Sequence, residues 1–422
     1  MNSKMMMSAS SALMCALVCG VAVDVYGQTK MFNYSLPNNP NTRAEFMRQG
    51  VGDRGFHFGN LELSPYVNAE YKYNNNVDTD RHKYHDSSLY IRPGIDLKYT
   101  GSNWGLTGNG WYSRTWHKNY DELDSRRYSE RLGYWYQTEG GLRIVLSEQY
   151  SHSEDHDSII DGGRGIWRER EELRLSGVVS YQLGERTGVA LGMQYHDMDY
   201  KRNSKYANLY GYDEFAMELE LSRKLSERTN FLLAGGYQTY RSDGTSRGYN
   251  HRSNGYSVMA GLGSRATERI TYRALTGVGF WDYSGDVNAA WKYSLNANWM
   301  ISHKWALSLA GSSYFQPSER DRNQSVQTYT LSSGLSYRPI KRLSTHLDAA
   351  VRYEQNEYAS NGRDDSWEEM VSVRLRGDYH LIRCQDFSAN LYSSLEFNKE
   401  FSDRDDYEYD QFILRVGLRL FY

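Results

Sequence analysis

The chain has 422 residues and a formal net charge of -3, so it offers no broad basic surface, and nucleic acid is excluded as a partner on electrostatic grounds. It contains 37 Tyr and 10 Trp, whose side chains combine an apolar body with a polar tip and suit a boundary between lipid and water. The mean hydropathy of -0.74 is too low for helical membrane spans. Membrane strands tolerate such a value because only alternate residues face lipid.

The first 27 residues are typical of a secretory signal peptide. Lys4 supplies a positive start, the stretch that follows is largely apolar as far as Val23, and Val25-Tyr26-Gly27 is an acceptable cleavage site. A transmembrane anchor is the alternative, but the apolar run is short and interrupted by serines. Two of the three cysteines, Cys15 and Cys19, lie in this signal. The mature chain therefore keeps only Cys384 and forms no internal disulfide.

Residues 28–60 are polar and irregular, and from Leu61 the pattern changes. Segments of about ten to fourteen residues then alternate apolar and polar side chains with a period of two, separated by turn residues. In the first segment the apolar face holds Leu61, Leu63, Val67, Ala69, Tyr71 and Tyr73, and the polar face holds Glu62, Ser64, Asn68, Glu70 and Lys72.

This pattern predicts about eighteen antiparallel strands. They are expected to start near residues 61, 88, 104, 126, 142, 168, 187, 210, 229, 255, 269, 288, 304, 327, 342, 367, 386 and 409. The connections alternate strictly between short turns (100–103, 138–140, 183–186 and 338–341) and long polar loops (74–86, 152–165, 241–254 and 399–406). Short turns at one end and long loops at the other are typical of bacterial outer-membrane barrels, in which the short turns face the periplasm.

The last predicted strand carries a terminal signal. One of its faces consists of Phe412, Leu414, Val416, Leu418, Leu420 and Tyr422. A closing strand that ends in an aromatic residue resembles the C-terminal signature of outer-membrane barrels. The ending at Tyr422 therefore predicts the barrel-assembly machinery as a partner, together with the lipid of the outer membrane.

We therefore predict an all-β fold: a closed antiparallel transmembrane β-barrel over residues 61–422, after a signal peptide (1–27) and a periplasmic N-terminal segment or plug (28–60). Closure is required because a free sheet edge in lipid leaves backbone groups without hydrogen-bond partners. A soluble β-propeller is the main alternative. Its strands are shorter, and the sequence lacks a repeated Gly-His or Trp-Asp signature.

A barrel of about eighteen strands leaves room for an aqueous passage. The residues predicted to line it are Arg92, Lys98, Arg168, Arg170, Glu172, Arg174, Glu214, Glu218, Glu220, Arg352, Arg374 and Arg376. Opposed rows of basic and acidic groups would create a field across the pore. Alternatively, these charges form cross-strand ion pairs that stiffen the wall.

Aromatic residues are also predicted on the inner faces: Tyr66, Tyr90, Trp111, Trp135, Trp281 and Tyr392. There they would stack against the sugar rings of a saccharide. The alternative is that some of them belong to the interfacial girdles.

The segment Ser151–Asp157 holds the residue types of barrel hydrolases, and we place it in an external loop. Its two histidines are four residues apart, but on a loop they share no helix face, and no Gly-x-Ser-x-Gly elbow occurs in a strand-to-helix setting. A solvated acidic loop that at most holds a divalent cation loosely is the better interpretation. We expect no catalytic residues, no cofactor and no metal site.

The opening strand, Leu61 to Val67 followed by Glu70-Tyr71 and Asn74 to Val77, resembles the start of the β-barrel porin 2 group. The resemblance covers about residues 61–422 and includes size, Tyr-rich strands and the terminal aromatic residue. Asn75 departs from the Asp that many members have. The resemblance implies a porin-like outer-membrane protein, in a group of which many accompany exopolysaccharide production. It assigns no ligand residue.

The predicted function is a non-enzymatic outer-membrane channel that passes small hydrophilic solutes or exports a surface polysaccharide. Two alternatives stay open. One is a structural or adhesive barrel whose lumen is occluded, with residues 28–60 as the candidate plug. The other is an outer-membrane hydrolase.

Overall fold

The computed structural model describes residues 55–77, 84–157, 166–200, 211–242, 252–283, 286–317, 324–358, 366–383, 387–402 and 408–422. The strands are β1 (Phe56–Phe58), β2 (Leu61–Asn74), β3 (Asp86–Thr100), β4 (Trp104–His117), β5 (Ser125–Gln137), β6 (Leu142–Asp157), β7 (Ile166–Gln182), β8 (Thr187–Tyr200), β9 (Tyr212–Lys224) and β10 (Thr229–Ser242). They continue as β11 (Arg252–Ser264), β12 (Ile270–Tyr283), β13 (Asp286–Trp299), β14 (Trp305–Pro317), β15 (Gln324–Ile340), β16 (Leu343–Tyr358), β17 (Ser366–Arg383), β18 (Ser388–Ser402) and β19 (Tyr409–Phe421). A single 3-10 turn, η2 (Asp121–Leu123), accompanies them in these ranges. Among the same residues, no helix is long and apolar enough to cross a membrane.

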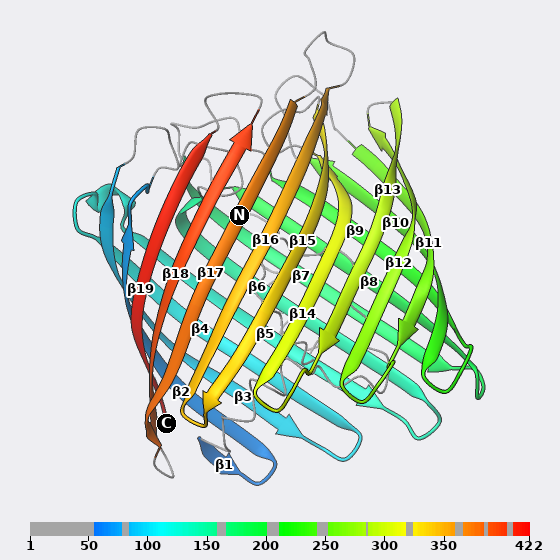
Figure 1. Ribbon diagram of the computed structural model, residues 1–422, viewed down its shortest axis with the longest axis horizontal. Coiled ribbons are helices and arrows are strands. Elements are labelled where there is room, and N and C mark those ends of the chain that lie inside the picture. The colour runs from blue at the N-terminus through cyan, green and yellow to red at the C-terminus, as the bar shows by residue number, and fades with distance from the viewer. Residues whose placement is uncertain are drawn as a thin grey trace, which may run out of the picture.

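Strands β2 to β19 form a closed antiparallel barrel. Each strand pairs with the next along the chain, and β19 returns to β2 with a register that runs from Phe421–Tyr66 to Ile413–Asn74. Figure 1 shows the tilted ring, with β14 to β19 on the near wall and the early strands on the far wall. The predicted closed barrel of about eighteen strands is confirmed. The predicted starting residues agree with the observed ones to within three positions.

The short strand β1 was not predicted. It pairs with β2 from Phe58–Leu61 to Phe56–Leu63. β19 pairs with the same edge of β2, but from Tyr66 onward. The ring of Phe56 lies 4.9 Å from that of Tyr422. β1 thus covers the β2 edge that β19 leaves free (Figure 1, bottom). The proposed signal peptide and most of the segment 28–60 lie outside the described residues, and recognition of Tyr422 by the assembly machinery stays a prediction.

Side chains alternate between lipid and lumen, as β9 illustrates. Met217, Leu219 and Leu221 point outward and are 38–47 % exposed. Glu218 and Glu220, on the opposite face, are 5 % and 4 % exposed. Successive residues of a strand point to opposite faces of the sheet, so this pattern produces an apolar outer surface and a polar inner one.

Two aromatic girdles bound the apolar surface. Near the short turns, Tyr99 stacks on Trp104, and Trp305 stacks on Tyr337 with ring centroids 4.0 Å apart. Toward the other end, a chain of outward-facing rings runs through Tyr293, Tyr329, Tyr353 and Trp367.

The distance between the girdles fits a bilayer. Tyr329 and Tyr337 belong to β15 and are eight residues apart, which corresponds to about 27 Å along a strand. A tilt of about 40° reduces this to about 21 Å in height, close to the apolar band of about 25 Å in outer-membrane barrels. The protein is therefore an outer-membrane β-barrel.

The connections confirm most of the expected alternation and correct two details. At the end where β19 finishes, every turn between neighbouring barrel strands has two to five residues. At the other end the connections are longer, except that only residues 284–285 separate β12 from β13, so the alternation is not strict. The predicted loops 152–165 and 399–406 are also partly wrong because β6 continues to Asp157 and β18 continues to Ser402.

The wall curls tightly at β10, β11 and β12, on the right-hand edge of Figure 1. A Cβ atom added to Gly261 would lie 1.9 Å from the backbone oxygen of Ala274, and one added to Gly277 would lie 1.9 Å from that of Val258. Only glycine permits these backbones to approach so closely. The corner encloses an inner apolar cluster of Leu232, Ala234, Met259 and Leu275, which are at most 3 % exposed.

Candidate pore lining

The residues predicted to line the pore belong, where the structure describes them, to inward-facing positions of five strands. Arg92 and Lys98 lie on β3, Arg170, Glu172 and Arg174 on β7, Glu214, Glu218 and Glu220 on β9, Arg352 on β16, and Arg374 and Arg376 on β17. Arg168 belongs to β7 as well, but its side chain lies outside the described set. That these residues line a conducting pore stays a proposal, which we argue below.

A histidine connects the basic residues of β7 with the acidic residues of β9. Glu172 hydrogen-bonds Arg174 and lies 2.8 Å from Nε2 of His196 on β8. Nδ1 of the same ring lies 3.7 Å from Glu214 on β9. The basic row of β7 and the acidic row of β9 therefore meet at His196, which is 3 % exposed. Sequence reasoning missed His196, although it occupies the inward parity of β8.

The other end of the acidic row is paired across the curled corner. Arg273 of β12 hydrogen-bonds Glu220 and lies 3.8 Å from Glu218. Three strand spacings separate β9 from β12 along the wall, so this contact depends on the tight curvature at Gly261 and Gly277.

A second ionic network joins β17, β18, β19 and β2. Glu396, which is 1 % exposed, accepts hydrogen bonds from Arg374 at 2.9 Å and from Arg415 at 2.6 Å. Arg415 also lies 3.8 Å from Glu70, which accepts a hydrogen bond from Tyr392. On the neighbouring wall, Arg352 lies 3.5 Å from Glu354. Many inward charges are thus compensated within the wall, as the ion-pair interpretation expected.

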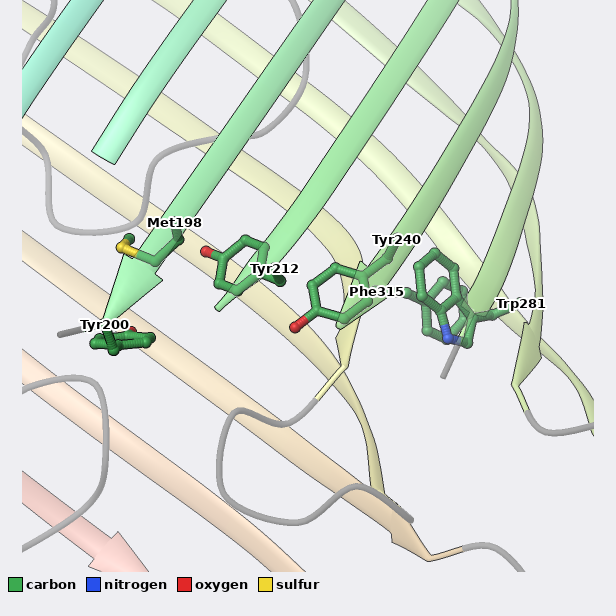
Figure 2. Packing of buried hydrophobic residues seen from close by; sticks show 6 residues of the cluster. All are labelled: Met198, Tyr200, Tyr212, Tyr240, Trp281 and Phe315. Carbon is green, nitrogen blue, oxygen red and sulfur yellow. The ribbon is translucent and has the colours of Figure 1, made fainter. Parts of the chain in front are cut away.

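Near the longer connections, aromatic side chains form a row along the inner wall. Figure 2 shows Met198, Tyr200, Tyr212, Tyr240, Trp281 and Phe315 following one another across the strand ends. The rings of Tyr212 and Tyr240 lie 4.9 Å apart, and Trp281 stacks on Phe315 at 5.8 Å. Trp281 was predicted to face inward, whereas Tyr212, Tyr240 and Phe315 were not singled out.

Phe315 breaks the alternation because the end of β14 separates from β13 while it stays paired with β15. β13 and β14 pair only from Ser294–Ser312 to Trp299–Leu307. Beyond that point the hydroxyl of Ser313 replaces the ladder, accepting from the Tyr293 N–H and donating to the Trp291 carbonyl. Tyr314 and Phe315 then point to opposite faces of β14, yet they are only 7 % and 3 % exposed. The end of β14 is therefore covered on both sides and narrows this end of the lumen.

The segment predicted as an external catalytic-type loop is the end of β6, and the prediction of a loop was wrong. His152 pairs in register with Tyr128, an outward-facing residue, and their rings stack at 4.9 Å. Nε2 of His152 lies 3.9 Å from both Glu154 and Glu169, a geometry that resembles a metal site among the described residues. Both carboxylate oxygens of Glu154 already accept hydrogen bonds from Arg126 at 2.8 Å, so a cation would have to displace that pair.

No protein-family model matches the chain, and no curated protein matches it in sequence. The resemblance to the β-barrel porin 2 group therefore stays a prediction. Among solved structures, the chain is similar to the siderophore receptor PirA from Pseudomonas aeruginosa, with 9 % identity, a TM-score of 0.44, and 85 % of this chain and 80 % of that chain covered. It is also similar to the FrpB iron transporter from Neisseria meningitidis (12 %, 0.43, 86 % and 65 %) and to Acinetobacter baumannii OccAB3 (10 %, 0.42, 85 % and 99 %). At these scores the likeness carries no argument about function, which must come from the residues of the barrel itself.

Proposed function

We propose that this barrel is a non-enzymatic outer-membrane channel for small hydrophilic solutes. One observation carries the proposal: eighteen strands close into one ring, and the inner face of that ring carries guanidinium, carboxylate and imidazole groups. Rings of sixteen to eighteen strands leave an aqueous passage, whereas small barrels fill their lumen with side chains. Charged inner walls are stable only when hydrated or paired.

The occluded barrel is the second candidate, and the inward end of β14 favours it. Tyr314 and Phe315 pack inside one end of the lumen, next to Trp281 and the aromatic row. A narrowing at one end restricts the size of the solute without closing the passage. The same aromatic row supports passage of a saccharide, because sugar rings have apolar faces that lie against aromatic rings. Export of a surface polysaccharide stays within this proposal as a finer possibility.

Planar-bilayer recordings of the refolded mature chain test the proposal. We expect stepwise ohmic currents in potassium chloride, because a hydrated lumen conducts ions. A variant that lacks residues 28–54 is the informative partner, since its deletion ends before β1 and preserves the Phe56–Tyr422 contact. Currents from either protein support a channel, and larger currents from the variant identify the N-terminal segment as a restriction.

Absence of current from both proteins, each shown to be folded by heat-modifiable migration, would refute the channel and leave the structural barrel.

Replacing Phe315 by alanine tests the narrow end of the lumen. If β14 restricts the passage, Phe315→Ala raises the conductance, whereas Phe412→Ala on the lipid-facing surface leaves it unchanged.

A further inference from the structure

Two arginines flank one asparagine on the inner wall where the chain closes. In the register of β3, β2 and β19, Asn68 lies opposite Arg92 on one side and opposite Arg419 on the other. Two strand spacings place the backbones of these arginines about 10 Å apart, a span that two arginine side chains readily bridge. Arg92 and Arg376 lie near enough to Arg419 to repel its charge, and Asp378 lies near enough to attract it.

Neither Arg92 nor Arg419 forms an ion pair with a carboxylate in the part of the chain that the structure describes. Their Nε atoms are buried and have no hydrogen-bond acceptor, and the same is true of Nε of Arg376. This arrangement differs from that of Arg374 and Arg415, which share Glu396 a few residues away.

Aromatic rings hold the two guanidinium groups instead. The Arg92 guanidinium lies 5.2 Å from the ring centre of Trp111 and 6.0 Å from that of Tyr66. The Arg419 guanidinium lies 5.6 Å from the ring of Tyr392. A ring face stabilises a cation without accepting its N–H groups in the plane, so the two Nη groups of each guanidinium stay available although Nε is buried.

The nearby carboxylates are already engaged. Asp96 accepts a hydrogen bond from Asn109, and Asp378 accepts one from Arg376 at 2.7 Å. Glu70 accepts one from the Tyr392 hydroxyl at 2.7 Å. Asp96 and Asp378 lie near enough to attract these arginines, but no carboxylate among the described residues forms an ion pair with either of them. The wall therefore holds two cations close together that stay available to an anion from the lumen.

We propose that Arg92 and Arg419 form a binding site in the lumen for the oxyanion group, a carboxylate or a phosphate, of an anionic hydrophilic solute. A guanidinium group binds such a group through two parallel N–H···O bonds. Tyr66 and Trp111, whose rings contact the Arg92 guanidinium, lie beside the site, and an acidic sugar is the solute class that the test compares with a simple oxyanion. This inference rests on the proposed channel function and specifies the charge of the solute.

The test uses glucuronate and glucose, which differ by the carboxylate, and inorganic phosphate as a ringless anion. Glucuronate is expected to block the chloride current of the refolded full mature chain, and glucose is not. Stronger block by glucuronate than by phosphate assigns the site to acidic sugars, whereas equal block assigns it to oxyanions in general. Either result supports the site.

The variant Arg92→Gln/Arg419→Gln is expected to lower the apparent affinity for glucuronate at least about tenfold, because both charge-assisted contacts are lost. The matched control, Arg170→Gln/Arg174→Gln, removes two inward guanidinium groups from β7 and is expected to change that affinity less than about twofold. Arg92→Lys/Arg419→Lys keeps the charge and serves if the glutamine variant fails to fold. It should weaken block by severalfold, because the planar fork is lost.

Equal losses in the glutamine variant and the β7 control would overturn the site and assign the effect to the overall field of the lumen. Conducting channels that glucuronate and phosphate do not block would also overturn it, while the channel function would stand. If the protein does not conduct, calorimetric titration of the detergent-solubilised barrel with glucuronate decides the matter. Binding that the arginine variant loses supports the site, and absence of binding refutes it.

Discussion

Replacing Gly261 by valine is expected to prevent the barrel from closing. The Cβ atom alone would lie 1.9 Å from the Ala274 oxygen and 2.8 Å from the Leu275 Cα, both of which are backbone atoms of β12. No side-chain rotation relieves such a contact, so β11 and β12 would have to separate at the tightest bend of the wall. A separation of β11 from β12 within the bilayer would leave unpaired backbone groups in lipid, each at a cost of several kcal/mol.

The folded fraction after refolding into detergent, read from heat-modifiable migration on a gel, measures this effect. Gly235→Val is the matched control, since Gly235 lies on β10, next to β11, and a Cβ atom added there would have no other atom within 4 Å. We expect the control to fold as the parent does and Gly261→Val to give little or no folded barrel. Equal folding of the two variants would show that the corner has room for a side chain.

The strands were predictable from sequence because the bilayer imposes one rule on each of them. A side chain that faces lipid must be apolar, so strands such as β9 and β19 alternate cleanly, and their starts were placed at residues 210 and 409 against Tyr212 and Tyr409 in the structure. The rule fails outside the bilayer. The end of β6 around His152 carries polar residues on both faces, so its sequence resembles a loop. β1 is too short for any alternation.

The inner wall was less predictable. Parity along the strands placed Arg374 and Glu220 on inner faces, but it gave no information about which charges meet. The contact of Arg273 with Glu220 spans three strand spacings and arises from curvature that Gly261 and Gly277 permit. Single glycines are a weak signal in a chain with 37 of them. The inward turn of Phe315 follows from the loss of pairing between β13 and β14, which alternation cannot reveal.

Replacing Glu396 by alanine is expected to lower the free energy of unfolding by about 3–5 kcal/mol, the usual cost of removing one partner from a buried ion pair. Glu396 is 1 % exposed and accepts from two arginines on opposite neighbouring strands, so its loss leaves Arg374 and Arg415 facing each other without a counter-charge. Urea titration of the barrel in lipid vesicles measures the change. Glu396→Gln keeps the shape of the side chain, and its free energy of unfolding should lie between that of the parent and that of the alanine variant.

Lys98→Ala provides the comparison between a buried ion-pair network and an exposed ion pair in this wall. Lys98 pairs with Glu62 at 3.2 Å, but its side chain is 56 % exposed, so the loss should stay below about 1 kcal/mol. A similar loss for both variants would mean that water reaches the Glu396 carboxylate as freely as it reaches the rim. A large difference instead means that the Glu396 network is shielded from water and stabilises the wall.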